Sequence, residues 1–385
     1  MRNTLKKVSV YPPVMMLSMY FAVFSYMVPV MMEKFSMDYK GVGVISTVQF
    51  LGGLAAQILC FSVFAAMNKS RIILISLAAV TVSLVWLGFN NALFMLYVLF
   101  FVRGFFGNTA NTLSNALVTD VFDKRKEFFV GLYHALAAGA AIAGPYLALG
   151  LGNDFTVSFT TMGGIIGVSA VLFWLGMRKE VKEPFVADRN RFGGIGKIFA
   201  LLRRRGMIML MLIIFFCSFV QNTIVIYITS FGLGLRGVEA DGAFVLSMFL
   251  GGLFVGSMIY SFVSHRVYVM NIMLYFNILA FGILAAMLLS GNALAAGILA
   301  LAGGLFLGAN MPGLFVKLSN IVPEDSGAVS ALLFFGSIIA GLVAPVTIGA
   351  IADVIGIRYA LLISLSAFGA IIALVAVLRR QQAIA

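Results

Sequence analysis

The sequence contains few charged residues. Asp, Glu, Lys and Arg make up only 10% of its 385 residues, whereas 62% are hydrophobic. A soluble globular domain carries about 25% charged residues, so a surface built from this composition would not stay in water. The scarcity of charge excludes a soluble domain and predicts an integral membrane protein, whose partner is the lipid bilayer.

Cysteine and histidine are almost absent. The two cysteines, Cys60 and Cys217, lie far apart in separate apolar runs, and the two histidines are His134 and His265. Cysteines placed in this way are expected to behave as small hydrophobic residues. They predict neither a disulfide framework nor a metal site, and we expect no cofactor.

The sequence also lacks the motifs of common membrane enzymes and pumps. It has no nucleotide-binding P-loop, no HExxH pattern and no Ser/His/Asp grouping in a plausible extramembrane domain. Each of these motifs supplies groups that its chemistry requires. Their absence argues against an enzyme and against ATP-driven transport, and favours movement driven by gradients.

Long apolar runs are what the sequence has in abundance. About 20 apolar residues form a helix that crosses the hydrocarbon core of a bilayer. The runs predict an all-α integral membrane protein with twelve transmembrane helices in two pseudo-symmetric six-helix bundles. The bundles are expected at 1–177 and 206–385, with a cytoplasmic basic linker at 178–205. The runs themselves fall near 12–32, 40–66, 71–89, 92–119, 127–151, 156–177, 206–231, 240–263, 267–289, 293–319, 326–351 and 357–378.

The net charge of +12 is unevenly distributed. Basic residues outside the spans gather in loops on one side of the membrane, except for Lys34, Lys40, Arg236 and Arg358. Cytoplasmic loops carry an excess of Lys and Arg, so we expect both termini in the cytoplasm and a place in the cell (inner or plasma) membrane. This distribution argues against nucleic-acid binding. The start of the chain is basic and lacks a cleavage site, which predicts that the first helix is retained.

The fifth and the eleventh run correspond to each other. Pro145 aligns with Pro345, and a small residue precedes each proline. Paired, interrupted helices in corresponding positions of two halves indicate a secondary transporter. We therefore predict gating or hinge positions at Gly144, Pro145, Pro312 and Pro345.

Six plus six helices, a long basic linker and cytoplasmic termini resemble the major facilitator superfamily over essentially the whole chain. The run Leu99-x-x-x-Arg103-x-x-Phe106-Gly107 is similar to the fourth-helix arginine motif of that family. In the fifth helix, Gly131, Ala140, Gly144 and Pro145 stand at the spacing of its glycine-proline motif, with Ala140 replacing a glycine. The loop motif after the second helix is reduced to Ser62 through Arg71, in which only Arg71 clearly matches. The resemblance implies alternating access between two bundles.

A shorter stretch resembles fucose-permease-type sugar symporters. Its residues are Met311-Pro312-Gly313-Leu314-Phe315, followed by Gly341-x-x-x-Pro345-x-x-x-Gly349-x-x-x-Asp353. Those symporters carry membrane carboxylates in their first and fourth helices. Here the runs 12–32 and 92–119 contain none.

Ionisable residues near the bilayer centre usually mark function, because placing a charge there is costly. All 14 acidic residues lie at predicted helix ends or in loops, which leaves Arg103 as the one clear central charge. Arg103 either attracts an anionic substrate or takes part in proton coupling, or it binds nearby carbonyls and packs helices.

His134 is the one membrane histidine, and histidine can change charge near neutral pH. It is either a coupling residue or a neutral histidine satisfied by a neighbouring helix.

Uncharged polar residues supply the other candidates. Amides in helix bundles often only link helices, by about 0.6 kcal/mol each, yet some of the set should line a central cavity. The predicted substrate-binding residues are Tyr20, Gln49, Arg103, Asn108, Asn111, Gln221, Asn222 and Asn310.

These features predict a monomeric secondary active or facilitative transporter of a small polar organic solute, sugar-like or a small organic anion. Symport is a candidate mode, with protons as a candidate coupling partner. Two alternatives stay open. The 36 Phe and 21 Met residues would suit proton-coupled efflux of hydrophobic compounds, because methionine is common on promiscuous surfaces. The other alternative is a non-transporting membrane receptor or scaffold.

Overall fold

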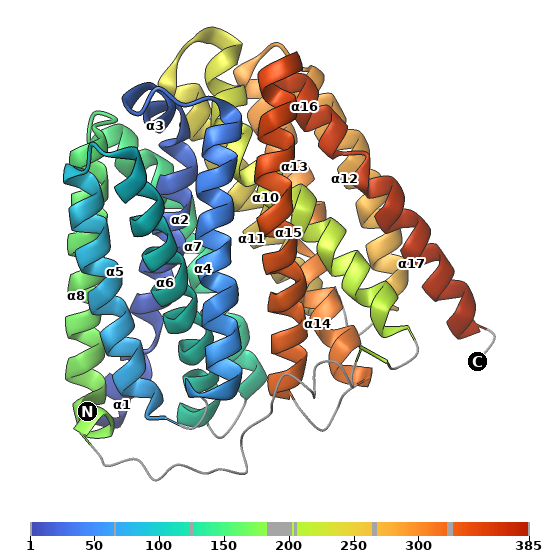
Figure 1. The fold of residues 1–385 in the computed structure, drawn as a ribbon. Helices are drawn as coiled ribbons and strands as arrows, with labels where there is room; N and C mark the ends of the chain where they lie inside the picture. Colours follow the sequence, from blue (N-terminus) through green and yellow to red (C-terminus); the bar gives the residue numbers. More distant parts are fainter. Residues whose placement is uncertain are drawn as a thin grey trace. The chain divides into compact units, whose positions relative to one another are not determined.

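The computed structural model describes residues 2–64, 67–122, 126–182, 202–203, 206–263, 268–321 and 326–383. Every regular element in these ranges is an α-helix (Figure 1). Among these residues, 12 helical stretches are long and apolar enough to cross a membrane. The predicted all-α fold with twelve transmembrane helices is therefore confirmed, and the chain is a multi-pass membrane protein. His265 and most of the predicted linker 178–205 lie outside the described residues.

The chain divides into two compact units. The first unit comprises residues 1–23 and 48–197, and the second comprises residues 24–47 and 198–385. Residues 24–47 thus belong to the second unit, although they lie within the first predicted set of helices. The bundle boundaries expected from the sequence stay a prediction.

In the first unit, α5 packs against both α6 and α8 (Figure 1). Glycines bring these helices together. A Cβ on Gly163 of α8 would lie 3.1 Å from the carbonyl oxygen of Thr81 in α5, so the glycine allows the two helices to approach closely. The helices of this unit are α1 (Arg2–Ser9), most of α2 (Tyr11–Tyr26), most of α4 (Tyr39–Ser62), α5 (Lys69–Phe89), α6 (Leu93–Val121), α7 (Lys126–Gly150) and α8 (Phe155–Lys182).

The second unit is organised in the same way around α11 and α13, which pack against each other. A Cβ on Gly304 of α13 would lie 3.1 Å from the backbone nitrogen of Leu253 in α11, and Gly252 and Gly256 of α11 face the backbone of α13 in return. The unit contains the end of α2, α3 (Val28–Lys34), the start of α4, α10 (Met207–Arg236), α11 (Glu239–Val263), α12 (Val269–Leu289), α13 (Ala293–Gly308), α14 (Asn310–Ile321), α15 (Ser326–Ile355), α16 (Ile357–Ser364) and α17 (Ala367–Ala383).

Three of the expected helices are interrupted. The first breaks at Met27, after which Pro29 lies in the first turn of α3. The tenth breaks at Ala309, and Pro312 lies in the first turn of α14. Proline is tolerated in a first turn because its missing N–H would have no helical partner there. The twelfth breaks at Leu365, between α16 and α17, without a proline.

One end of the first unit is held by a cluster of polar contacts. The Nε and Nη2 atoms of Arg71, at the start of α5, donate to the carbonyl oxygen of Val181 at the end of α8, at 3.2 and 3.0 Å. Asn68 donates to the Glu180 carbonyl at 2.6 Å, and Lys6 of α1 forms an ion pair with the Glu180 carboxylate at 2.7 Å. These contacts satisfy carbonyls that a helix leaves without partners at its end. Arg71, the matching residue of the reduced loop motif, thus caps α8.

Candidate functional site

Arg103 lies in α6, with its guanidinium stacked on the ring of Tyr20 from α2. The guanidinium carbon is 3.9 Å from the ring centroid. Arg103 is only 7% exposed and Tyr20 is fully buried. A cation over an aromatic face gains about 2 kcal/mol when it is desolvated, which offsets part of the cost of burying this charge.

Gly107 lies next to the guanidinium of Arg103. It lies four residues after Arg103, on the same face of α6. A Cβ at Gly107 would be 3.6 Å from both Cζ and Nε of Arg103, which is ordinary van der Waals contact, so the planar group lies directly against this position. On its other side, the Tyr20 ring packs against Phe159 of α8, with the ring centroids 6.2 Å apart. The arginine-glycine motif and the two aromatic rings therefore pack together inside the first unit.

Three polar atoms of the predicted substrate-binding residues in this unit are buried without a hydrogen-bond partner. They are Nε of Arg103, the hydroxyl of Tyr20 and Oε1 of Gln49. In the described part of the chain, no carboxylate forms an ion pair with Arg103. A buried donor or acceptor without a partner costs about 1–3 kcal/mol. Such unmet groups are rare in proteins and call for an explanation.

The other two candidates of α6 already have partners. The Asn108 amide donates to the carbonyl of Gly104 at 2.8 Å and lies against Gly53 of α4. The Asn111 amide oxygen accepts a hydrogen bond from the Tyr133 hydroxyl of α7 at 3.1 Å. The Asn108 bond stays within α6, whereas the Asn111 bond links α6 to α7. A role of these two residues in binding a substrate stays a prediction.

The candidates in the second unit fall into two kinds. Gln221 and Asn222 of α10 are half-buried and form no hydrogen bond with another described residue. Asn310 is 1% exposed and exchanges hydrogen bonds with Asn277 of α12 at 2.9 and 3.0 Å. Asn277 was not singled out from the sequence, because nothing in the run 267–289 distinguishes it from other polar residues in the spans.

His134 is exposed on the surface of α7. Its ring contacts the Tyr133 ring edge-on, with centroids 5.4 Å apart. Its side chain is accessible and has no carboxylate partner among the described residues. Its predicted coupling role stays a prediction.

The predicted hinge residues occupy different environments. A Cβ on Gly144 would be 2.8 Å from the Met19 carbonyl and from Cβ of Ala22, so α7 touches the backbone of α2 at this point. Pro145 and Pro345 lie inside the continuous helices α7 and α15. Only Pro312 accompanies a break in its helix.

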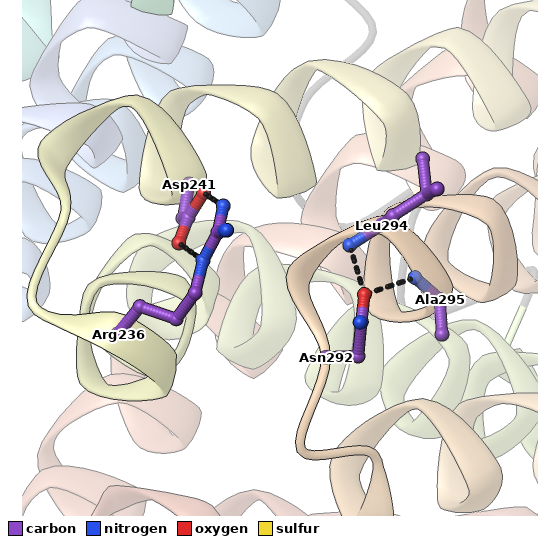
Figure 2. A network of polar contacts seen from close by, with 5 residues as sticks. All are labelled: Arg236, Asp241, Asn292, Leu294 and Ala295. Atoms are coloured by element: carbon purple, nitrogen blue, oxygen red, sulfur yellow. Dashed lines mark hydrogen bonds and ion pairs between the residues drawn. The ribbon is translucent and has the colours of Figure 1, made fainter.

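Figure 2 shows a polar cluster in the second unit that the sequence predicted only as helix ends. Arg236, the last residue of α10, donates two hydrogen bonds to the Asp241 carboxylate of α11, at 2.7 and 2.5 Å. A cation at a helix C-terminus and an anion at a helix N-terminus both suit the helix dipoles. Asn292 caps α13 by accepting from the backbone of Leu294 and Ala295. The cluster fixes the turns between helices.

A second group missed from the sequence surrounds Asp353 of α15. Its carboxylate accepts hydrogen bonds from the backbone N–H groups of Tyr39 and Lys40 at 2.8 and 2.9 Å. The Tyr227 hydroxyl of α10 lies 2.7 Å from the Pro345 carbonyl oxygen and 3.1 Å from that of Tyr39. Asp353 was noted in the sequence only as part of a motif at the end of a span.

Several solved structures of transporters have a similar fold. A bacterial homologue of the human lysosomal transporter Spinster, solved in an inward-facing, occupied conformation, is 14% identical with a TM-score of 0.77, covering 97% of this chain and 96% of its own. A mutant of the nucleoside transporter NupG is 10% identical with a TM-score of 0.78, covering 98% and 99%. A mutant of the E. coli fucose:proton symporter FucP is 15% identical with a TM-score of 0.63, covering 95% and 97%.

Among curated proteins, a sequence search finds no match. The sequence model described as Major Facilitator Superfamily matches residues 14–303, which is well over half of the chain. It includes α6 with Arg103 and α7 with Gly144 and Pro145. The chain therefore belongs to the major facilitator superfamily and is a transporter rather than an enzyme.

Proposed function

We propose that this transporter moves a small polar organic solute that carries an acidic group, by alternating access of two bundles. The observation that carries the proposal is Arg103, a buried guanidinium whose Nε donor has no partner and which no described carboxylate neutralises. An arginine presents five N–H donors in a planar fork that matches carboxylate and phosphate. The stacking on Tyr20 uses the face of this group and leaves its edge donors free for such an anion.

The neighbouring polar atoms support a small hydroxyl- or carbonyl-bearing solute. The Tyr20 hydroxyl can donate and accept, and Gln49 Oε1 can accept. Both are buried and without partners. A solute that satisfied several of these groups would gain specificity, because an analogue lacking the matching group would leave them unpaired.

The names of two similar structures point in the same direction. One is a nucleoside transporter and one is a fucose:proton symporter, and both solutes are small and polar. Coupling is proposed to differ from a carboxylate-based symporter, because the spans 12–32 and 92–119 lack acidic residues. The solute would move either as a uniport substrate or with a proton bound at His134. Both termini and the basic segment 178–205 are proposed to be cytoplasmic.

The proposal is tested by thermal unfolding of the purified protein in the presence of matched solutes. The probes are D-glucose against D-glucuronate and uridine against uridine monophosphate, each pair differing by one acidic group. Because a ligand that binds the folded state stabilises it, we expect the acidic member of a pair to raise the melting temperature more. Counterflow of the best solute in proteoliposomes then measures transport.

The matched controls are Arg103→Gln and Arg358→Gln. Arg358 also lies over an aromatic ring, that of Phe231 at 5.6 Å, but it is at an end of α16. We expect the preference for the acidic probe to vanish in Arg103→Gln and to persist in Arg358→Gln. Equal stabilisation by acidic and neutral probes in both variants would reject the anionic solute. Stabilisation by hydrophobic compounds alone would instead favour efflux.

A further inference from the structure

We propose that Asp353 is a latch that holds the start of α4 closed against α15 and α10, and that it sets how often this contact opens. The opening of the latch as a step of transport rests on the proposed alternating access. The latch itself does not. It lies at the end of the second unit where the turn before α4, residues 35–38, is found.

The latch begins with an incomplete helix start. The first amides of a helix have no partner inside it and need one from elsewhere. In α4, the first two amides, those of Tyr39 and Lys40, donate to the two carboxylate oxygens of Asp353 at 2.8 and 2.9 Å. A carboxylate that accepts from a helix N-terminus is favoured by both hydrogen bonds and the helix dipole.

The next two amides are satisfied locally. The Gly41 amide donates to the Asp38 carboxylate at 2.7 Å, and the Val42 amide donates to the Asp38 carbonyl oxygen at 3.2 Å. The cap of α4 is therefore divided equally between a residue next to the helix and a residue of α15. Only the Asp353 half is lost when α4 moves away from α15.

The surfaces behind this cap fit closely. A Cβ on Gly43 of α4 would be 2.5 Å from the Pro345 carbonyl oxygen and 2.6 Å from Cα of Val346. A Cβ on Gly349 of α15 would collide with the Tyr39 carbonyl oxygen of α4 and would lie 2.7 Å from the Tyr227 hydroxyl of α10. The contact is thus made by backbone on both sides, and any added side chain would push the helices apart. Thr47 extends it by donating to the Leu342 carbonyl at 2.8 Å.

The exposure of the polar groups makes this contact reversible. Asp353, Lys40 and Asp38 are all exposed, so water can replace their partners when the contact opens. The Asn277–Asn310 pair, by comparison, is buried and would leave unmet groups in an apolar interior. A carboxylate at an accessible helix start can therefore release and rebind, which is what a latch requires.

The experiment measures how fast a buried reporter cysteine reacts with a maleimide in the purified protein. Cys60 and Cys217 are first replaced by alanine, and Ser230→Cys is introduced. Ser230 is 6% exposed and lies on the α10 face of Tyr227, one turn further along. We expect Asp353→Ala to raise the labelling rate about tenfold, because two charge-assisted hydrogen bonds are lost. Asp353→Asn, which keeps one acceptor oxygen, should give a smaller rise.

Two controls separate a latch from a general loosening. Asp38→Ala removes a carboxylate from the same helix start but leaves the contact with α15, so the rate should change less than about twofold. Gly349→Ala should raise the rate, whereas Gly234→Ala in α10, with nothing within 4 Å of its Cβ, should not. Equal rises in Asp38→Ala and Asp353→Ala would mean fraying of α4 and would overturn the latch.

The labelling experiment needs no solute, so it tests the latch independently of the proposed transport function. An unchanged rate in folded Asp353→Ala and Asp353→Asn overturns the latch, whatever the flux assays show. A raised rate in a protein that moves no solute in proteoliposomes supports the latch and overturns the proposed function. Monodisperse elution and an unfolding transition of each variant show that it is folded.

Discussion

Asn277 and Asn310 hold each other through two hydrogen bonds, each amide nitrogen donating to the other's carbonyl oxygen at 2.9 and 3.0 Å. The Asn277 amide also donates to the Met273 carbonyl at 2.7 Å. The pair lies where the tenth helix breaks, since Asn310 is the first residue of α14. It therefore ties the broken helix to α12.

Removing one member should leave the other without a partner in the buried interior. We expect Asn310→Ala and Asn277→Ala each to lower the free energy of unfolding by about 1–3 kcal/mol. The double variant should cost less than the sum, because the second change removes the orphaned group. Thermal unfolding in detergent measures the stability of the single and double variants. If Asn310→Ala instead weakens solute binding at unchanged stability, Asn310 contacts the substrate as the sequence predicted.

A substitution at Gly144 tests whether this glycine is needed for close helix packing or for a hinge motion. Gly144→Ala should destabilise the first unit by about 1–3 kcal/mol, because the added methyl group meets the backbone of α2. Gly139→Ala in the same helix meets nothing within 4 Å and should be neutral or slightly stabilising. Unfolding of both variants is compared with wild type. Equal stability of the two, combined with slower solute exchange in Gly144→Ala, would favour a hinge.

His134 tests the coupling proposal. Because its side chain is exposed on α7, His134→Gln should unfold at the wild-type temperature. We expect the variant to keep solute exchange in proteoliposomes but to lose accumulation driven by a pH gradient, since glutamine does not titrate. Accumulation that survives in the variant would place the proton path elsewhere.

The orientation in the membrane is tested by an impermeant thiol reagent in intact cells. Cysteines at Asn91 and Gly291, both in exposed turns between helices, should react from outside. Cysteines at Asn3 and Gln382 should react only after the membrane is permeabilised. The reverse pattern would contradict the orientation inferred from the basic loops.

The spans were predictable because a helix that crosses a bilayer needs about 20 consecutive apolar residues, and such a run can be recognised from the sequence alone. The break at Ala309 had a local signal in Pro312. The break at Leu365 had none, because no proline or charge marks it and the packing of the surrounding helices decides it. Helix ends defined by such packing cannot be read from hydropathy.

Individual residues of the candidate site were predictable, but their contacts were not. Arg103 stood out because it is the one clear charge near the middle of a span, and Tyr20 was among the polar candidates. Their contact was not predictable, because it depends on how α2 crosses α6. Asp353 was not selected, because it was one of the 14 acidic residues at predicted helix ends or in loops. Its partners, Tyr39 and Lys40, lie in another helix far away in the sequence.

The same distance has a consequence for how the protein is made. Asp353 follows Tyr39 by 314 positions, and a ribosome adding about 5–20 residues per second needs on the order of 15 to 60 s to cover them. During that interval α4 has entered the membrane with Asp38 as its only carboxylate cap. The cap at the start of α4 is completed only by a residue synthesised near the end of translation, so a chain truncated before α15 would carry a second helix whose start stays frayed.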